Sequence, residues 1–347
     1  MKKSILALAL PLAICAATFT GCEKKESSKG PSVAVFVPGI MADSPTYANF
    51  AAGVQDGIDE YNAKISDEKM KAKIHIMEAG TNQAEWATQL TALVANGTYD
   101  VIISSNPSLP EMAAELTKQF PNQKFLMMDG ALEGNKNIAC VSYDQKEQTY
   151  LCGYISGLMS KSHKVAVVAA QEYPVMNNVL YPYYALGAAD AFPGTTCDFR
   201  IVGNWYDASK GSEITDALIS QGVDVILPIC GGASQGVLAS AVEHGIYLTF
   251  IDENSYAKAA GTVIASVATK QRFAAKETVT NFLNGKTDWG KTRYVGITDG
   301  YIEYIQDDPI YKESVPEEIR NKMSELIDEI VSGKKNSSVT IGKIGIK

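Results

Sequence analysis

The sequence predicts an α/β protein whose chain folds into two lobes, each a parallel sheet covered by helices. Short apolar segments rich in β-branched residues alternate with segments whose apolar residues have helical spacing, and this pattern is typical of parallel sheets buried on both faces. The alternation runs as two series, and the roughly 315 residues they occupy exceed the usual size of one domain. A single doubly wound domain is the alternative.

The first series begins at the apolar run 33–37, which Pro38 and Gly39 end. The stretch 46–63 follows, with apolar residues at helical spacing. Further strands are expected at 73–77, 100–104, 124–129 and 138–144, and helices at 83–95 and 110–119. The crossover connections between these parallel strands should be right-handed.

The second series starts near residue 163, after a helix expected over 146–159. Its strands are expected at 163–170, 198–203, 224–229 and 247–252, and its helices at 178–191, 210–221 and 234–244. Four late segments follow, namely a strand over 260–270, a helix over 271–284, a strand over 292–297 and a helix over 316–331. Because these segments come after both series, several strands should cross between the lobes.

The N-terminus has the layout of a secretory signal peptide. Lys2 and Lys3 precede an apolar run over 5–17, and small residues lead to Cys22. We expect a lipoprotein signal over 1–21, a lipidated Cys22 and a flexible tether over 22–31 that holds the protein on the outer side of the cell membrane. An ordinary signal with a chance cysteine and a short membrane anchor are the alternatives, although the run is shorter than the roughly 20 residues that span a bilayer.

Composition excludes several classes of function. The net charge of −8 and the pI of about 5.1 argue against a nucleic-acid partner. The three histidines are isolated, so we expect no metal site, no general base, no cofactor and no enzyme activity. Four cysteines in the body form no CxxC pair, and whether they are buried thiols or a disulfide stays open: Cys140, Cys152, Cys197 and Cys230.

Polar, aromatic or glycine residues follow seven of the predicted strands. In open α/β sheets a ligand binds at the carboxyl ends of the strands, so these residues should line one cleft. The candidates are Asp43, Tyr47, Asn106, Asp129, Trp205, Gly231, Gly232, Asp252 and Lys270. Trp205 can stack on a flat ring, and the two glycines permit close backbone approach. The segment around Asp43 has an alternative role as a helix cap and nothing more.

Acidic side chains accept hydrogen bonds from neutral NH and OH groups. The candidate set therefore suits a neutral polyhydroxy or amino-substituted ring better than an anion, because a phosphate site would want more lysines, arginines or bare helix N-termini.

At these residues the chain resembles the basic membrane protein family of substrate-binding lipoproteins, the purine-nucleoside receptors that serve ABC importers. The resemblance runs from about Ser32 to Gly300 and is most specific in the stretches 141–170, 203–237 and 250–270. It implies a periplasmic-binding-protein fold of type I with three hinge crossings. The first lobe would comprise 32–143 and 266–288, and the second 144–265 and 289–347.

The resemblance also implies roles for single residues. In the family a purine base lies between aromatic rings from both lobes, and carboxylates and a lysine bind the base and the ribose. Trp205 matches the aromatic of the second lobe, and Asp252, Lys270, Asp129 and the Gly231–Gly232 pair match family positions. The protein would be a monomer. Its partners would be an ABC permease, a small nucleoside-like ligand and the membrane, which it would contact through lipidated Cys22.

The chain departs from the family at the end of the first strand. The family usually has Asp-Asp-Lys-Ser-Phe-Asn there, whereas residues 41–47 lack the lysine, and Asp43 and Tyr47 stand in for an Asp and the Phe only across a one-residue gap. A sugar, a modified base or a signalling furanone is therefore an alternative ligand, and a sensory or adhesion lipoprotein with a vestigial cleft is an alternative function.

Overall fold

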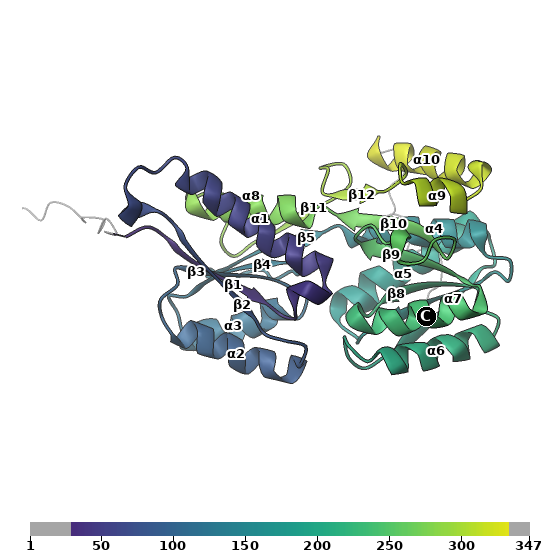
Figure 1. The fold of residues 1–347 in the computed structure, drawn as a ribbon, viewed down its shortest axis with the longest axis horizontal. Coiled ribbons are helices and arrows are strands. Elements are labelled where there is room, and N and C mark those ends of the chain that lie inside the picture. Colours follow the sequence, from purple (N-terminus) through teal and green to yellow (C-terminus); the bar gives the residue numbers. More distant parts are fainter. Residues whose placement is uncertain (1–28, 333–347) are drawn as a thin grey trace, which may run out of the picture.

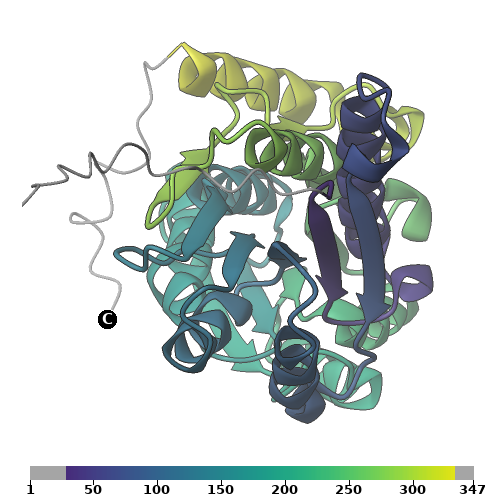
Figure 2. The same cartoon turned by 90° about the vertical axis from the view of Figure 1, so that its left-hand side faces the viewer.

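The computed structural model describes residues 29–332, and these residues form two sheets side by side along the long axis of the molecule (Figure 1). Figure 2 views the first lobe end-on, so that the two sheets lie one behind the other. The expected signal, the lipidated Cys22 and most of the tether lie outside the described residues. Gly30 and Pro31 of the expected tether already belong to the folded body, because Gly30 N donates to Lys69 O and Pro31 O accepts from Lys73 N.

The first sheet is entirely parallel, in the order β11-β5-β4-β3-β1-β2. Its strands are β1 (Ser32–Val37), β2 (Lys73–Glu78), β3 (Val101–Ser105), β4 (Lys124–Met128), β5 (Ile138–Tyr143) and β11 (Thr292–Val295). Helices α1 (Pro45–Asn62) and α8 (Gln271–Leu283) cover one face, and α2 (Gln83–Ala95) and α3 (Leu109–Gln119) cover the other. Alternate residues of β1 enter the two cores, as expected for a strand buried on both faces.

The second sheet has the order β12-β10-β9-β8-β6-β7, and only β12 runs antiparallel. Its strands are β6 (Lys164–Ala169), β7 (Thr196–Ile201), β8 (Val225–Ile229), β9 (Tyr247–Asp252), β10 (Val263–Thr269) and β12 (Ile302–Tyr304). The helices are α4 (Gln145–Met159), α5 (Tyr181–Ala191), α6 (Ala208–Ser220), α7 (Ser234–His244), α9 (Pro309–Ser314) and α10 (Glu317–Val331). Helices α4 and α5 pack together, as do α6 and α7.

The chain passes between the sheets three times, which confirms the expected type of two-lobed fold. It crosses from β5 to α4, from β10 to α8, and from β11 to β12. Two boundaries differ from the expected ones. Residues 266–269 pair in the second sheet as the end of β10. Residues 289–295 belong with the first lobe, because Trp289 packs edge-on against Phe282 of α8 and β11 pairs with β5.

Local sequence explains where the elements at the site begin. Ser44 caps α1 by accepting a hydrogen bond from Tyr47 N at 3.3 Å, and Pro45 occupies the first turn. Asp43 therefore belongs to a short 3-10 helix before the cap and is not the cap itself. Within residues 29–332, each helix is either too short or too polar to cross a lipid bilayer.

Candidate functional site

A cavity of about 370 Å³ lies between the lobes, at the carboxyl ends of the strands of both sheets. It is lined by eight of the nine residues that the sequence singled out: Asp43, Tyr47, Asn106, Asp129, Trp205, Gly231, Gly232 and Asp252. Seven of these residues follow β1, β3 and β4 in the first lobe and β7 and β8 in the second, and Asp252 is the last residue of β9. The shared carboxyl-end position explains why segments far apart in the sequence meet here.

Tyr47 and Asn106 form the wall of the first lobe. Asn106 is buried, and its Nδ2 donates to Tyr47 Oη at 3.1 Å while its Oδ1 accepts from Ser108 N at 2.9 Å. Burial raises the pKa of the Tyr47 phenol above its ordinary value, with smaller contributions from Tyr206, Asp129 and Asp252. The phenol is therefore neutral and fixed in orientation, so that its ring presents a stable face.

Trp205 and Tyr173 form the aromatic wall of the second lobe, with ring centroids 6.3 Å apart. The indole Nε1 of Trp205 is buried and has no hydrogen-bond partner within residues 29–332. A buried donor without a partner costs free energy of about 1–3 kcal/mol, and an acceptor in the cavity would remove that cost. Tyr173 is not among the residues that the sequence predicted, although it follows β6 by four residues, as Trp205 follows β7.

Gly231 and Gly232 leave room for the residues that follow β7. A Cβ at Gly231 would lie 3.0 Å from Trp205 O and 3.3 Å from Trp205 Cε3, and a Cβ at Gly232 would lie 3.0 Å from Tyr206 Cδ1. Gly231 also has a φ of 57°, in the left-handed region that favours glycine. Both glycines line the cavity, and their lack of a side chain permits the close approach of Trp205 and Tyr206.

Asp129 and Asp252 are a pair of carboxyls that end strands in opposite lobes, at β4 and β9. Both have backbone φ values in the left-handed region, 57° and 75°, which costs about 1–3 kcal/mol for a residue with a side chain. Burial, followed by the charge of Asp252, raises the pKa of Asp129 well above its ordinary value. Burial raises the pKa of Asp252 to about 6, although Gln148 opposes the shift.

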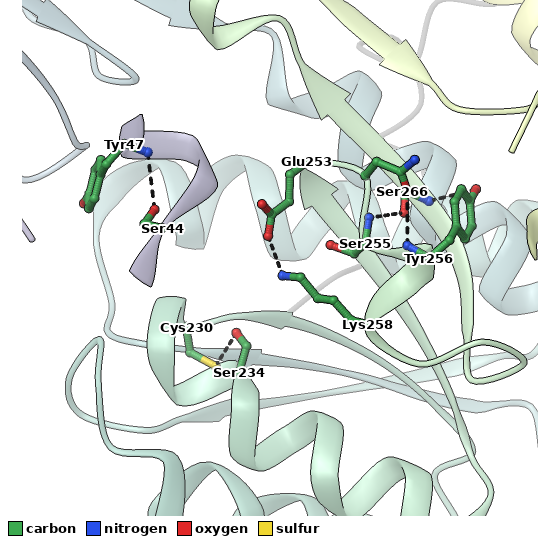
Figure 3. A network of polar contacts seen from close by, with 10 residues as sticks. Ser44, Tyr47, Cys230, Ser234, Glu253, Ser255, Tyr256, Lys258 and Ser266 are labelled. Atoms are coloured by element: carbon green, nitrogen blue, oxygen red, sulfur yellow. Dashed lines mark hydrogen bonds and ion pairs between the residues drawn. The ribbon is translucent and has the colours of Figure 1, made fainter. Parts of the chain in front are cut away.

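Lys258 is the cationic side chain of the cavity lining, and the sequence analysis did not select it. It follows β9 by six residues, in a 3-10 helix (Tyr256–Lys258) that turns back over the cavity. Its ammonium pairs with Glu253 and lies 5.0 Å from the ring centroid of Phe250. Figure 3 shows this pair across from Ser44 and Tyr47, with Cys230 and Ser234 below them, and all six residues line the cavity.

Lys270, by contrast, is not part of the cavity wall. Its Nζ lies 3.5 Å from Glu303 of β12, and its backbone N donates to Tyr301 O at 2.8 Å. The reason is local pairing, because the antiparallel strand β12 pairs with the end of β10, Thr269 with Ile302. The end of β10 therefore faces the third crossing instead of the cleft.

Two short patterns associated with catalysis occur in the chain, and neither has the required structural context. Residues 285–292 match the phosphate-loop pattern G-x-x-x-x-G-K-[ST], but they connect helix α8 to strand β11, the reverse of the strand-to-helix order that cradles phosphate. Residues 232–236 match G-x-S-x-G, but Ser234 Oγ contacts Cys230 Sγ at 3.3 Å, and no histidine of the described residues lines the cavity.

The electrostatic character of the cavity follows from its titratable groups. Its described lining contains four carboxyl side chains, Asp43, Asp129, Asp252 and Glu253, against the single ammonium of Lys258. Aromatic rings occupy walls from both lobes. Such a cavity disfavours anions and suits a flat ring with hydrogen-bond donors. Among residues 29–332, no cluster of three or more His, Cys, Asp or Glu side chains could hold a metal ion.

Comparison with known proteins gives a family and a fold. The family model described as "ABC transporter substrate-binding protein PnrA-like" matches residues 31–336. The "ABC transporter nucleoside-binding protein BmpA" of Lactococcus lactis is 23% identical over 247 residues, which is 70% of this chain and 69% of that protein. "Basic membrane protein A" of Borreliella burgdorferi is 23% identical over 329 residues, which covers 92% of this chain and 93% of that one.

A solved structure of similar fold comes from Aeropyrum pernix K1 and is described as an ABC transporter system solute-binding protein. It superposes with a TM-score of 0.69 over 88% of this chain and 92% of that chain. The identity is 18%, so this likeness bears on the fold alone.

Proposed function

The chain belongs to the PnrA-like family of ABC transporter substrate-binding proteins, and from this membership we propose that it captures a purine nucleoside for an ABC importer. The family consists of solute-binding proteins and not of enzymes, so the partners are a small molecule and a permease. That the ligand is a purine nucleoside goes beyond what family membership gives. A relative named as a nucleoside-binding protein supports it, and so does the construction of the cavity.

The observation that carries the proposal is that both lobes contribute an aromatic ring and a carboxyl to one cavity. Tyr47 and Asp129 come from the first lobe, and Trp205 and Asp252 come from the second. A heterocyclic base offers two flat faces for the rings and polar edges for the carboxyls. A ligand held in this way contacts both lobes only when they are closed, so its binding stabilises the closed state.

The excess of carboxyls separates a nucleoside from a nucleotide. A phosphate would meet three carboxyls that have no cationic partner in the cavity wall, since the ammonium of Lys258 is paired with Glu253. Like charges brought into such a site are strongly unfavourable. We therefore propose that Glu253 and Lys258 bind polar, uncharged groups of the ligand such as sugar hydroxyls. A hydroxyl can accept a hydrogen bond from the ammonium and donate one to the carboxylate.

The protein would act as a monomer on the outer side of the cell membrane, held there by lipid on Cys22. The basis is the sequence of the N-terminal segment, with its charged start, apolar run and Gly-Cys end. Mass spectrometry of the protein purified from membranes tests this directly. A diacylglyceryl cysteine at Cys22 is expected as the N-terminal residue, and a chain that begins at another residue without lipid would contradict the anchor.

A thermal-shift screen tests the ligand. Purified protein is heated with guanosine, inosine, adenosine, the corresponding nucleotides, free bases, sugars and amino acids. A ligand that binds only the folded state raises the unfolding free energy by about 2.7 kcal/mol at a hundredfold excess over its dissociation constant. We expect a rise with the purine nucleosides and none with their nucleotides. A rise with sugars alone would replace the nucleoside by a sugar, and no rise with any compound would favour a protein whose cleft is vestigial.

A further inference from the structure

Two side chains at the start of α4 hold the carboxyls of Asp129 and Asp252. Gln145 Nε2 donates to Asp129 Oδ1 at 3.1 Å, and Gln148 Nε2 donates to Asp252 Oδ1 at 3.4 Å. Gln148 is fully buried, and its Nε2 also donates to Val267 O at 2.9 Å, which fixes the direction of its amide. Residues three apart on a helix lie on one face, with Cβ atoms about 5–6 Å apart. The two amides therefore bring one carboxyl from each lobe to the same turn of α4, and the charge of Asp252 acts on Asp129 there.

The surroundings do not supply the positive charge that two carboxylates would need. The charge of Glu253 raises the pKa of Asp252 further, and the ammonium of Lys258 in the same cavity is paired with Glu253. The two carboxyls in turn raise the pKa of the phenols of Tyr47, Tyr143 and Tyr173. Arg293 acts on Tyr143 but is not among the groups that shift either carboxyl. The N-terminus of α4 contributes only about half a unit of positive charge, and the two glutamines contribute neutral donors.

We propose that Asp129 and Asp252 bind the ligand as a pair that holds one proton, with one carboxyl donating a hydrogen bond and the other accepting one. Two carboxyls held close together cannot both ionise without a cation between them. The ligand edge that complements such a pair has an acceptor beside a donor, as in the lactam C=O and N–H of a hypoxanthine or guanine ring. The choice of a purine ring as the ligand rests on the proposed function. The assignment of one proton to the carboxyl pair does not.

The position of the pair also indicates that the proton is present before the ligand binds. Gln145 is the first residue of α4, directly after the crossing from β5 to the second lobe. Points close to a hinge are displaced least when lobes open. Burial raises the pKa of both carboxyls, and the charge of Asp252 raises that of Asp129 further. We therefore expect one proton to remain near neutral pH in the ligand-free protein as well.

Infrared spectroscopy tests the proton without a ligand. Spectra of ligand-free protein at pH 7 are compared with those of Asp129→Asn, Asp252→Asn and, as a control on an exposed carboxyl of α3, Glu115→Gln. The wild type should show the carbonyl band of one protonated carboxylic acid, which each Asn substitution removes and Glu115→Gln retains. Absence of this band from the wild-type spectrum overturns the proposal, whether or not the protein binds guanosine. A band that remains in both Asn variants also overturns it.

Calorimetric titration with guanosine tests the consequence for binding. If the bound pair must keep its proton, affinity is full at low pH and falls by up to about tenfold per pH unit once the free pair loses that proton. In Asp129→Asn this dependence should vanish, because the amide is a permanent donor and acceptor. Affinity that is flat or rises with pH in the wild type overturns the proposal. If guanosine binds at no pH while the infrared band is present, the purine assignment fails and the one-proton pair stands.

Discussion

Gln171 Nε2 donates to Ser108 Oγ at 3.2 Å, and this hydrogen bond joins the two lobes outside the cavity. Gln171 follows β6 in the second lobe, whereas Ser108 precedes α3 in the first. The same glutamine accepts from Gln83 Nε2, at the start of α2, at 3.3 Å. One side chain thus contacts two elements of the opposite lobe, and these contacts exist only while the lobes are together.

Replacing Gln171 with alanine should weaken ligand binding without contact to the ligand. A net hydrogen bond contributes about 0.5–1.5 kcal/mol, so removing this link should lower affinity by about two- to tenfold. The effect should appear mainly as faster dissociation, measured by stopped-flow fluorescence. Gln55→Ala is the matched control, because Gln55 donates to Asp59 on its own helix. Equal dissociation rates in both variants would contradict the role of Gln171 in closure.

Trp205 should supply the largest single share of ligand affinity. Stacking of a base on an aromatic side chain is worth about 1–3 kcal/mol by alanine substitution, so Trp205→Ala should weaken guanosine binding by about 5- to 150-fold. Trp205→Phe retains a flat face and should lose less. Calorimetric titration measures both, and the melting temperature of the ligand-free proteins checks the fold. An affinity unchanged in Trp205→Ala would remove this ring from the ligand site.

Lys258 and Lys270 should differ in their effect on binding. Lys258→Met removes the ammonium of the cavity wall and leaves Glu253 unpaired, which adds negative charge to the site. We expect a loss of at least about tenfold, since charged hydrogen bonds contribute about 1.5–3 kcal/mol. Lys270→Met removes only a half-exposed contact with Glu303, and its affinity should stay within about twofold of the wild type. If Lys270→Met weakened guanosine binding more than Lys258→Met in the same titration, Lys270 would be the lysine that binds the ligand.

The two lysines show what the sequence could predict of the site and what it could not. Asn106 and Asp129 directly follow central strands of the first sheet, and they were found by position because the carboxyl ends of parallel strands meet at one cleft. Lys270 also follows a strand, but the antiparallel strand β12 pairs with the end of β10 and Lys270 contacts the third crossing at Tyr301. Tyr173 follows β6 by four residues, the same separation as Trp205 from β7, so its position could have indicated it. Lys258 lines the cavity from a 3-10 helix that follows the turn after β9. Such turns depend on tertiary contacts, as with Ser255 N donating to Ser266 Oγ at 3.0 Å (Figure 3).

The strands and helices were predicted more completely than their assignment to the two lobes. Continuous apolar runs identified the central strands of both sheets, whereas the short β12 and α9 were missed because three to six residues carry little periodicity. The position of residue 289 was misassigned for a related reason. Membership of a lobe is decided by packing, here by Trp289 against Phe282, and the sequence pattern of a crossing segment does not reveal on which side it packs.

The packing of α4 on α5 should be the most sensitive point of the second lobe. A Cβ at Gly153 of α4 would lie 2.0 Å from Tyr184 O, and a Cβ at Gly187 of α5 would lie 2.2 Å from Tyr150 O. The two helix backbones therefore touch, and a methyl group at either glycine must push them apart. Overpacking of this kind costs about 1–3 kcal/mol and occasionally more, so Gly153→Ala should lower the unfolding free energy by at least about 2 kcal/mol in urea titrations.

Gly153→Ala should also weaken guanosine binding, because α4 carries Gln145 and Gln148. A shift of α4 relative to the second sheet would lengthen the contact between Gln148 Nε2 and Asp252 Oδ1, which is already 3.4 Å. Gly285→Ala is the control, since Gly285 has a φ of 68° and no atom within 4 Å of its Cβ position. It should cost only about 1–2 kcal/mol of stability and leave guanosine affinity unchanged. If Gly153→Ala destabilises no more than Gly285→Ala, then α4 does not hold a fixed position, and the carboxyl pair would need another support.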